Sequence, residues 1–236
     1  MPAASQPLSP AQATNTIVRA ALIPSGSTGR PVAATGTLAN AVTVTTQGTA
    51  QALTATLDAA LTGSLIQAGQ ALEFISPAGT SVIATVATTY AGSGTSLDLS
   101  ANETIPDNST FEFPPRARLR QSADVNKATA TTSFSSFDHS VAAQSIGETT
   151  ADGAFNGGYS YYDAFWQTCQ YAQKNKLKFY VERELESPDS SVFGTGPVTW
   201  GIAIVTALAS PAANGAEVQG NVTVAFDSVN DVNPLT

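Results

Sequence analysis

One stretch of this 236-residue chain has the apolar spacing of a helix, and most of the remainder has the pattern of strands. In residues 160–175 (SYYDAFWQTCQYAQKN), large apolar side chains recur at i, i+3, i+4 and i+7, at Tyr162, Phe165, Trp166 and Cys169. Ser160 as N-cap and Asp163 three residues later fit a capping box. The apolar stripe of a single helix needs a sheet to cover it, so we predict a mainly β fold, a β-sandwich or barrel with one packed α-helix.

Residues 36–115 form a series of short strand-like runs separated by turn residues. AVTVTTQ, GQALEFIS, TSVIATVATTY, TSLDLS and STFEFP have strand composition, and QALTATLDAAL fits either a strand or a helix. Runs of this length and spacing are typical of a sandwich or small barrel. Every charge in the segment is negative, and Pro114 and Pro115 close it. We therefore predict an inserted small β module over 36–115.

The predicted module divides one core into two pieces. Residues 1–35 are expected to form an N-terminal arm and the first strand of the core, NTIVRAALIP, since prolines keep the start of the arm irregular. Residues 116–236 supply the rest of the core. This part holds an alternating stretch, the expected loop ETTADGAFNGG, the helix and the strand KLKFYVERE.

A long β-hairpin is predicted over residues 198–226. The period of two places the large side chains on one face, at Val198, Trp200, Ile202, Ile204, Leu208, Val222, Val224 and Phe226. The alternate face of the first strand carries small or shallow side chains, at Gly201, Ala203, Val205 and Ala207. We expect the large face to pack on the apolar stripe of the helix.

Charged residues make up 12% of the chain, about half the usual share, and the net charge is −8. An acidic surface does not favour binding nucleic acid through its phosphates. Basic residues after Arg30 form two clusters, around 116–127 and 174–183, which fit solvated faces or contacts between basic and acidic subunit edges. No apolar run approaches the roughly 20 residues that span a bilayer, and the start has no secretory signal, so we expect no membrane partner.

Side chains with reactive chemistry are few, and we predict no catalytic, cofactor-binding or metal site. His139 is the single histidine and fits a surface or interface position better than a general base. Cys169 is the single cysteine, so no intrachain disulfide can form, and this points to a reducing cytoplasm. Its position on the helix stripe fits a buried small apolar side chain. Glu182, Glu184 and Glu186 alternate as on a solvated strand face rather than as a pair of glycosidase carboxylates. The chain is therefore not expected to be an enzyme.

The order of elements in the last 110 or so residues resembles the tail tube proteins (major tail proteins) of long-tailed bacteriophages. The resemblance rests on the Thr-rich NKATATTSFSSFDHS, the segment GETTADGAFNGG, the helix SYYDAFWQTCQYAQKN, the strand KLKFYVERE and the pair VTWGIAIVTALAS and VQGNVTVAFDSV. It implies stacked hexameric rings whose hairpins join into one lumen wall. The implied partners are tape measure and tail terminator or baseplate proteins, and a sheath protein if the tail is contractile.

The resemblance implies a structural virion protein that is assembled in the host cytoplasm and conducts DNA without binding it specifically. In this hypothesis Thr199, Gly201, Ala203, Asn221 and Thr223 face the lumen or the next subunit, and the large face of the hairpin turns toward the subunit core. The alternative is an adhesion or glycan-binding β module of a phage fibre or cell surface, which would need aromatic side chains exposed in a groove.

Overall fold

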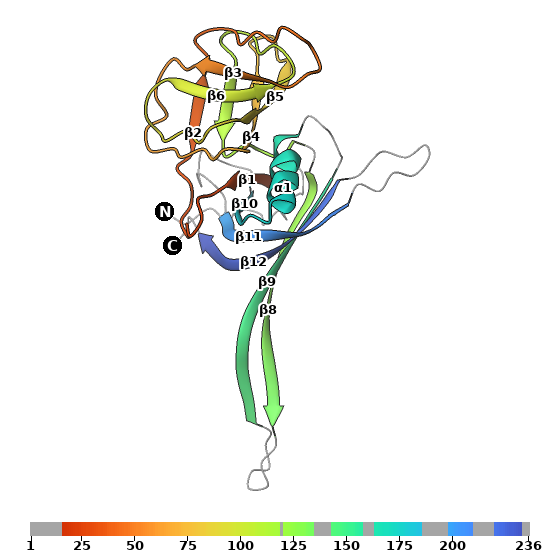
Figure 1. Cartoon of the computed structure of the whole chain (residues 1–236). Helices are drawn as coiled ribbons and strands as arrows, with labels where there is room; N and C mark the ends of the chain where they lie inside the picture. Colours follow the sequence, from red (N-terminus) through yellow and green to blue (C-terminus); the bar gives the residue numbers. More distant parts are fainter. Residues whose placement is uncertain are drawn as a thin grey trace, which may run out of the picture.

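The computed structural model describes most of the chain as a mainly β protein with two antiparallel sheets and one α-helix among the described residues (Figure 1). The described ranges are 16–118, 120–134, 143–157, 163–185, 198–209 and 220–232. This agrees with the predicted fold class. His139, Ser160, Tyr162 and Glu186 lie outside the described residues.

The first sheet, together with the helix, forms a unit that we call the body. Its six strands follow the order β1-β10-β11-β12-β9-β8. Their bounds are β1 Thr16–Leu22, β8 Arg120–Phe134, β9 Ala143–Gly157, β10 Phe179–Leu185, β11 Val198–Ala209 and β12 Asn221–Val232. The sheet curls until β1 meets the segment that leads into β8, where the Ala117 N–H donates to the Val18 carbonyl at 2.8 Å.

Helix α1 (Ala164–Lys174) fills the inside of this curl. Phe165, Trp166 and Cys169, three members of the predicted stripe, are at most 5% exposed and pack with Phe155, Phe179, Val181, Val222 and Val224. The N-cap is Asp163 rather than the predicted Ser160, and its carboxylate accepts a hydrogen bond from the Phe165 N–H at 3.0 Å. An Asp caps a helix as well as a Ser does, so the sequence pattern marked the helix but not its first residue.

The second sheet, which we call the module, is a small closed barrel. Its strands follow the order β2-β7-β4-β5-β6-β3. Their bounds are β2 Ala34–Thr37, β3 Gln51–Thr56, β4 Ala71–Ile75, β5 Ser81–Val86, β6 Ser96–Ala101 and β7 Thr110–Phe113. The first and last strands meet through the bridge Leu38↔Leu57 and the hydrogen bond from the Ala39 N–H to the Thr56 carbonyl. The run that fitted strand or helix forms β3.

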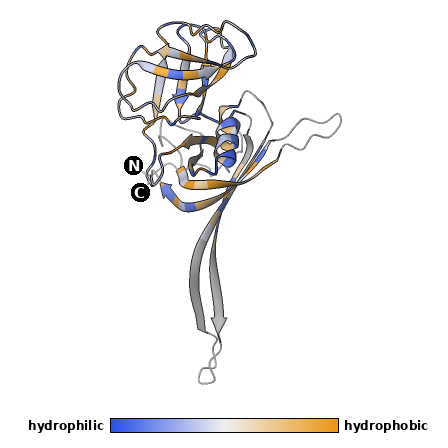
Figure 2. Ribbon diagram, viewed as in Figure 1, coloured by the Kyte–Doolittle hydropathy of each residue, from blue (hydrophilic) through white to orange (hydrophobic). Residues whose placement is uncertain are grey.

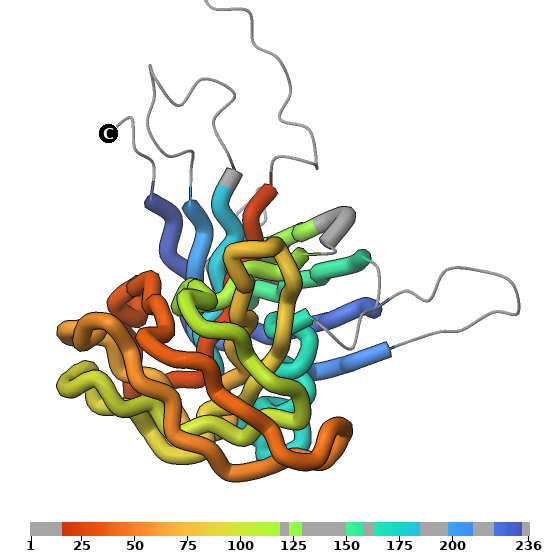
Figure 3. Tube along the Cα trace, turned by 90° about the horizontal axis from the view of Figure 1, so that it is seen from above, coloured from red at the N-terminus to blue at the C-terminus, as the bar shows by residue number. Residues whose placement is uncertain are grey.

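The module sits directly on the outer side of the body sheet, and the two share one apolar core. Ala21, Tyr180 and Ile202 of the body belong to the same buried cluster as the module's Phe74 and Phe111. From above, the module lies over the body, while the paired ends of β11 and β12 extend past its outline (Figure 3). The outer side of β10 and of the first half of β11 is therefore covered.

Buried polar contacts also join the module to the body. The side chain of Gln70, at 0% exposure, accepts from the Leu22 N–H at 2.7 Å and donates to Thr168 Oγ1 at 2.9 Å. Gly69 has a φ of +88°, and a Cβ added there would lie 2.2 Å from the Tyr171 ring of α1. The close approach of α1 therefore needs a glycine at this position.

The segment predicted as the loop ETTADGAFNGG is instead the second half of strand β9. Strands β8 and β9, of 15 residues each, pair along their length and project from the body as a two-stranded arm (Figure 1). The Gly and Asp of this segment resemble loop composition, but the ladder to β8 supplies its hydrogen bonds. The sequence did contain one sign of long uninterrupted strands here, because no proline occurs between Pro115 and Pro188.

The faces of β11 differ from the prediction, whereas Val222, Val224 and Phe226 of β12 pack in the cluster around α1 as predicted. The small face of β11, with Ala203 at 0% exposure and Val205, packs toward α1, whereas Trp200 and Ile202 pack against the module. Ile204, predicted to face the core, is 41% exposed. The register shift between Val205 and Ala207 breaks the alternation of β11 and places Leu208 against the cluster around α1. The sequence did not reveal that a second unit covers the large face of β11 before Ile204.

Candidate functional site

The described residues contain no group of three His, Cys, Asp or Glu side chains that could hold a metal ion. Cys169 is a free thiol at 0% exposure inside the body core, where it packs as a small apolar side chain. Among the described residues no helix is long and apolar enough to cross a lipid bilayer.

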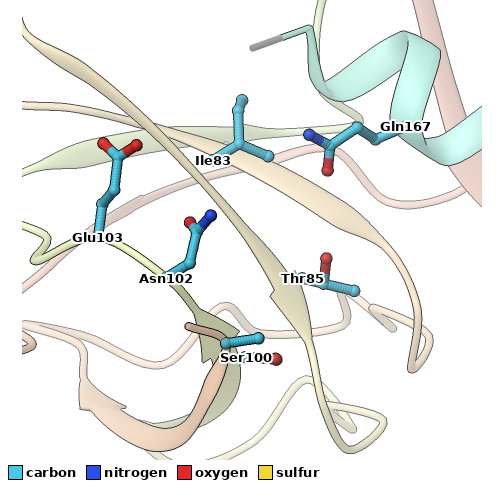
Figure 4. A pocket seen from close by; sticks show the side chains of 7 residues that line it. Ile83, Thr85, Ser100, Asn102, Glu103 and Gln167 are labelled. Atoms are coloured by element: carbon cyan, nitrogen blue, oxygen red, sulfur yellow. The ribbon is translucent and has the colours of Figure 1, made fainter. Parts of the chain in front are cut away.

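A cavity of about 150 Å³ lies where the module meets α1. Thr85, Ser100, Asn102 and Glu103 of the module and Gln167 of α1 contribute its polar lining (Figure 4). The cavity has one carboxylate, from Glu103, and its other polar groups are amides and hydroxyls. One carboxylate among hydroxyls and amides does not by itself point to a reaction.

The predicted solvated face of β10 is buried. Glu182 is 2% exposed and Glu184 is 9% exposed, because the module and its connecting segment cover this side of the strand. Arg19 Nη1 contacts Glu182 at 2.8 Å and Glu184 at 2.6 Å. Because a buried charge needs a partner of opposite sign, we assign these two carboxylates a structural role in pairing with Arg19.

The connecting segment is tied to the same cluster through Arg30. Its Nη2 lies 2.6 Å from Glu182 Oε2, and its Nε donates to Tyr180 Oη at 3.1 Å. Tyr180 donates in turn to Glu182. Burial and this hydrogen bond raise the pKa of the Tyr180 hydroxyl, so it stays a donor at any ordinary pH.

The body has strand edges that no described strand covers. β10 begins at Phe179, opposite Ala203, so residues 204–209 of β11 have a partner on one side only. β8 pairs with β9, and among the described strands none lies on its other side over Arg120–Phe134. Such edges are templates for pairing with another chain.

Between these two edges lies a four-stranded surface, which we call the open face. Cross-strand partners share a face of a sheet, so the register defines its rows. The first row is Ile204, Ala225, Asp152 and Asn126, and the second is Ala207, Thr223, Ala154 and Asp124. Asp124 and Asp152 are the charged members of these rows, and both are exposed.

Cations in this region point away from the open face. Lys127 of β8 alternates with Asn126 and lies on the same side as Ala123 and Val125, where it forms an ion pair with Asp231. β11 is largely hydrophobic along its length, including the part beyond β10 (Figure 2). The open face therefore combines small side chains with negative charge.

The five positions expected to face a lumen or a neighbour differ in their surroundings. Thr223 is exposed and Asn221 half-buried, both on β12. Gly201 and Ala203 are instead buried against the body core, so their assignment is wrong, and Thr199 is half-buried and bonded to Asp231. The contribution of β8 and β9 to the same surface was missed, because they were not predicted as paired strands.

No protein-family model matches the chain, and no curated protein matches its sequence. The functional argument therefore rests on the geometry described above.

Proposed function

We propose that this chain is the subunit of a bacteriophage tail tube, a structural virion protein that forms stacked hexameric rings around a lumen that conducts DNA. The observation that carries the proposal is the open face, a four-stranded acidic surface of small side chains that ends in an uncovered edge on each side. A repeating unit of this kind can continue its sheet from copy to copy. Closing the ring would then satisfy both edges.

The two edges of the open face define the contact between neighbours in a ring. In our proposal, residues 204–209 of β11 in one copy pair with β8 of the next. The interface is heterologous, since different surfaces meet, and such interfaces generate rings when the rotation closes. Backbone hydrogen bonds would supply much of the contact, which agrees with the absence of charged side chains in residues 204–209 of β11.

The β8–β9 arm supports assembly for an independent reason. A two-stranded ribbon is marginally stable alone in water, and the arm projects beyond the body core (Figure 1). Its strands are rich in Ala, Thr and Ser, which offer little apolar surface for a core. We infer that the arm is stabilised by neighbouring copies in the same ring or in the next one.

The chemistry of the open face suits the passage of DNA. Its rows carry Asp124 and Asp152, and the nearest lysine of β8, Lys127, is turned to the other side. Phosphates are repelled by such a wall and find no cation to bind. The module covers β10 and the first half of β11 on this same side of the curled sheet, next to the open face.

The adhesion or glycan-binding alternative is not favoured by a specific observation. The large apolar side chains exposed among the described residues are Val32, Leu65, Leu177, Ile204 and Val232. None of them is aromatic, whereas a sugar-binding groove would use exposed rings. The tape measure, tail terminator or baseplate and sheath proteins remain the proposed partners, and the virion remains the proposed location.

Electron microscopy of the purified protein tests the proposal. We expect six-fold rings or hollow tubes, formed alone or after addition of virion extract. Light scattering over a range of concentrations gives an independent measurement. A species that stays monomeric at every concentration, with and without extract, would contradict the proposal.

A further inference from the structure

A β-bulge interrupts the uncovered part of β11 at Thr206. Val205 lies opposite Val224 of β12 and Ala207 lies opposite Thr223, so Thr206 is one residue more than the ladder needs. Its hydroxyl donates to the Thr223 carbonyl at 3.1 Å, which holds the extra residue at this position. Among the described strands, none pairs with this part of β11 on the side away from β12, so the bulge lies in the middle of an open edge.

The side chains next to the bulge would keep their faces in a regular strand. Ile204 and Ala207 belong to rows of the open face, and Val205 and Leu208 pack toward α1. If Thr206 were absent, the residues on either side of it would alternate regularly and would keep these faces. Packing of the body therefore does not require the extra residue, and its effect falls on the edge of the strand.

The composition of this edge favours the addition of another strand. Residues 204–209 (IVTALA) include no charged residue and no proline, and Ile204 is 41% exposed. This end of β11 also extends past the outline of the module (Figure 3). An open apolar edge can pair with the same edge of another copy and so cause uncontrolled association. The charged side chains that commonly protect an edge are not used in this stretch.

We propose that the Thr206 bulge prevents the β11 edges of two copies of this chain from pairing with each other. A bulge bends and twists its strand and displaces the N–H and C=O groups beyond it from their regular spacing. It divides the open edge into two short stretches, residues 204–205 and residues 207–209. A stable ladder needs a longer regular run than either stretch provides. The bulge therefore controls an interaction surface, and the partner that it excludes is β11 of a second copy.

The effect of the bulge is a property of the single chain and holds whether or not the chain forms a tube. β8, the proposed ring partner of this edge, has an irregularity of its own, a register shift between Arg120 and Ser122. Pairing of β8 with β11 would therefore join two irregular edges of different sequence. Excluding pairs of β11 strands leaves the edge free for such a partner.

Deletion of Thr206 tests the proposal, because it gives an uninterrupted edge and keeps the faces of β11. In sedimentation velocity we expect the deletion variant to form dimers at least about tenfold more tightly than the unmodified chain. Thr206→Val is the matched control, since it removes the hydroxyl but keeps the extra residue, and it should associate like the unmodified chain. Circular dichroism checks that both variants fold. Equal association of the folded deletion variant and the unmodified chain would overturn the proposal.

A second measurement leaves Thr206 in place and so does not depend on the folding of the deletion variant. Ala207→Cys and Ala209→Cys place a thiol on the open edge, and Ala52→Cys places one on β3 of the closed module, all at exposed positions. Cys169 is buried and does not compete. Under oxidation we expect the two edge variants to form disulfide-linked homodimers no faster than Ala52→Cys. Faster dimers through either edge position would show that β11 edges pair despite the bulge, and would overturn the proposal.

The outcomes also separate this proposal from the proposed function. Rings of the unmodified chain, with no new dimers after deletion of Thr206, would leave the tail tube standing and reject the role of the bulge. New dimers of the deletion variant, with no rings of the unmodified chain under any condition, would support the role of the bulge and reject the tube. A chain that associates in neither form would reject both.

Discussion

The module and the body are six-stranded units of one chain, yet their edges differ. The module's β2 and β3 are joined through Leu38↔Leu57, so its barrel closes on itself. The body curls only until β1 touches the lead-in to β8, and it leaves β8 and the outer half of β11 uncovered. A closed barrel offers little strand edge to another chain, so under the proposed function we expect self-assembly through strands to use the body.

Their cores give a second contrast, because they are not separate. The module's cluster includes Tyr180 and Ile202 of the body, while the body's own cluster surrounds α1. Removal of the module would therefore expose part of the body. Without it, Tyr180, Ile202 and half-buried Trp200 would face water.

The largest expected effects on stability come from removing one large aromatic side chain from either core. Trp166 in the body is 5% exposed and Phe111 in the module is 1% exposed. Trp166→Ala and Phe111→Ala should each lower the free energy of unfolding by about 3–5 kcal/mol. Since one cluster spans both units, we expect a single transition in denaturant, followed by circular dichroism and by tryptophan fluorescence. Two transitions, with Phe111→Ala shifting one of them, would show that the units unfold independently.

Gly201→Ala should have the next largest effect, and it tests the buried side of β11. An added Cβ would lie 2.1 Å from the Ser228 carbonyl oxygen and 2.7 Å from the Phe226 ring. Such overpacking costs about 1–3 kcal/mol, measured by denaturant unfolding. Gly29→Ala is the control, because a Cβ there meets no atom within 4 Å. Equal stability of the two variants would mean that Gly201 does not face the packed core.

A lysine placed on a strand should weaken self-association when it lies on the open edge of the body, but not when it lies in the closed barrel of the module. Ala209→Lys lies on the uncovered part of β11, and Ala52→Lys lies on β3 of the module, both at exposed positions. An edge lysine opposes strand addition, so Ala209→Lys should weaken self-association about tenfold, which corresponds to about 1.4 kcal/mol. Ala52→Lys should leave it unchanged. Analytical ultracentrifugation measures both, and equal effects would argue against β11 as an assembly edge.

The smallest effect concerns the charge of the open face. Thr223→Lys places a cation in the row with Asp124, and Thr223→Gln is the uncharged control. If this face lines the tube, rings should form in both variants, while the lysine slows DNA delivery by a phage that carries it. The difference should be greatest at low salt, where charge attraction is least screened. Delivery unchanged at every salt concentration would indicate that Thr223 does not face the DNA.

Several elements could be predicted because their signals are local. The α1 stripe of Phe165, Trp166 and Cys169 repeats at the period of a helix, and the helix formed with that stripe buried. The short runs of 36–115 contain the turn residues that separate strands, and the module's strands lie between Ala34 and Phe113. The hydrophobic pattern and turn chemistry act over a few residues, so a sequence records them directly.

The sequence by itself determined the fold class, the helix and its buried stripe, and the sparse supply of reactive groups. Only the tertiary structure decided that Glu182 is buried beside Arg19, that Gly201 and Ala203 face the core, and that β8 and β9 pair as an arm. The period of two assigns residues to alternate faces of a strand but does not say which face will be covered, or by what. That depends on contacts between distant segments: here the module occupied the side of β11 that the pattern alone had assigned to the helix.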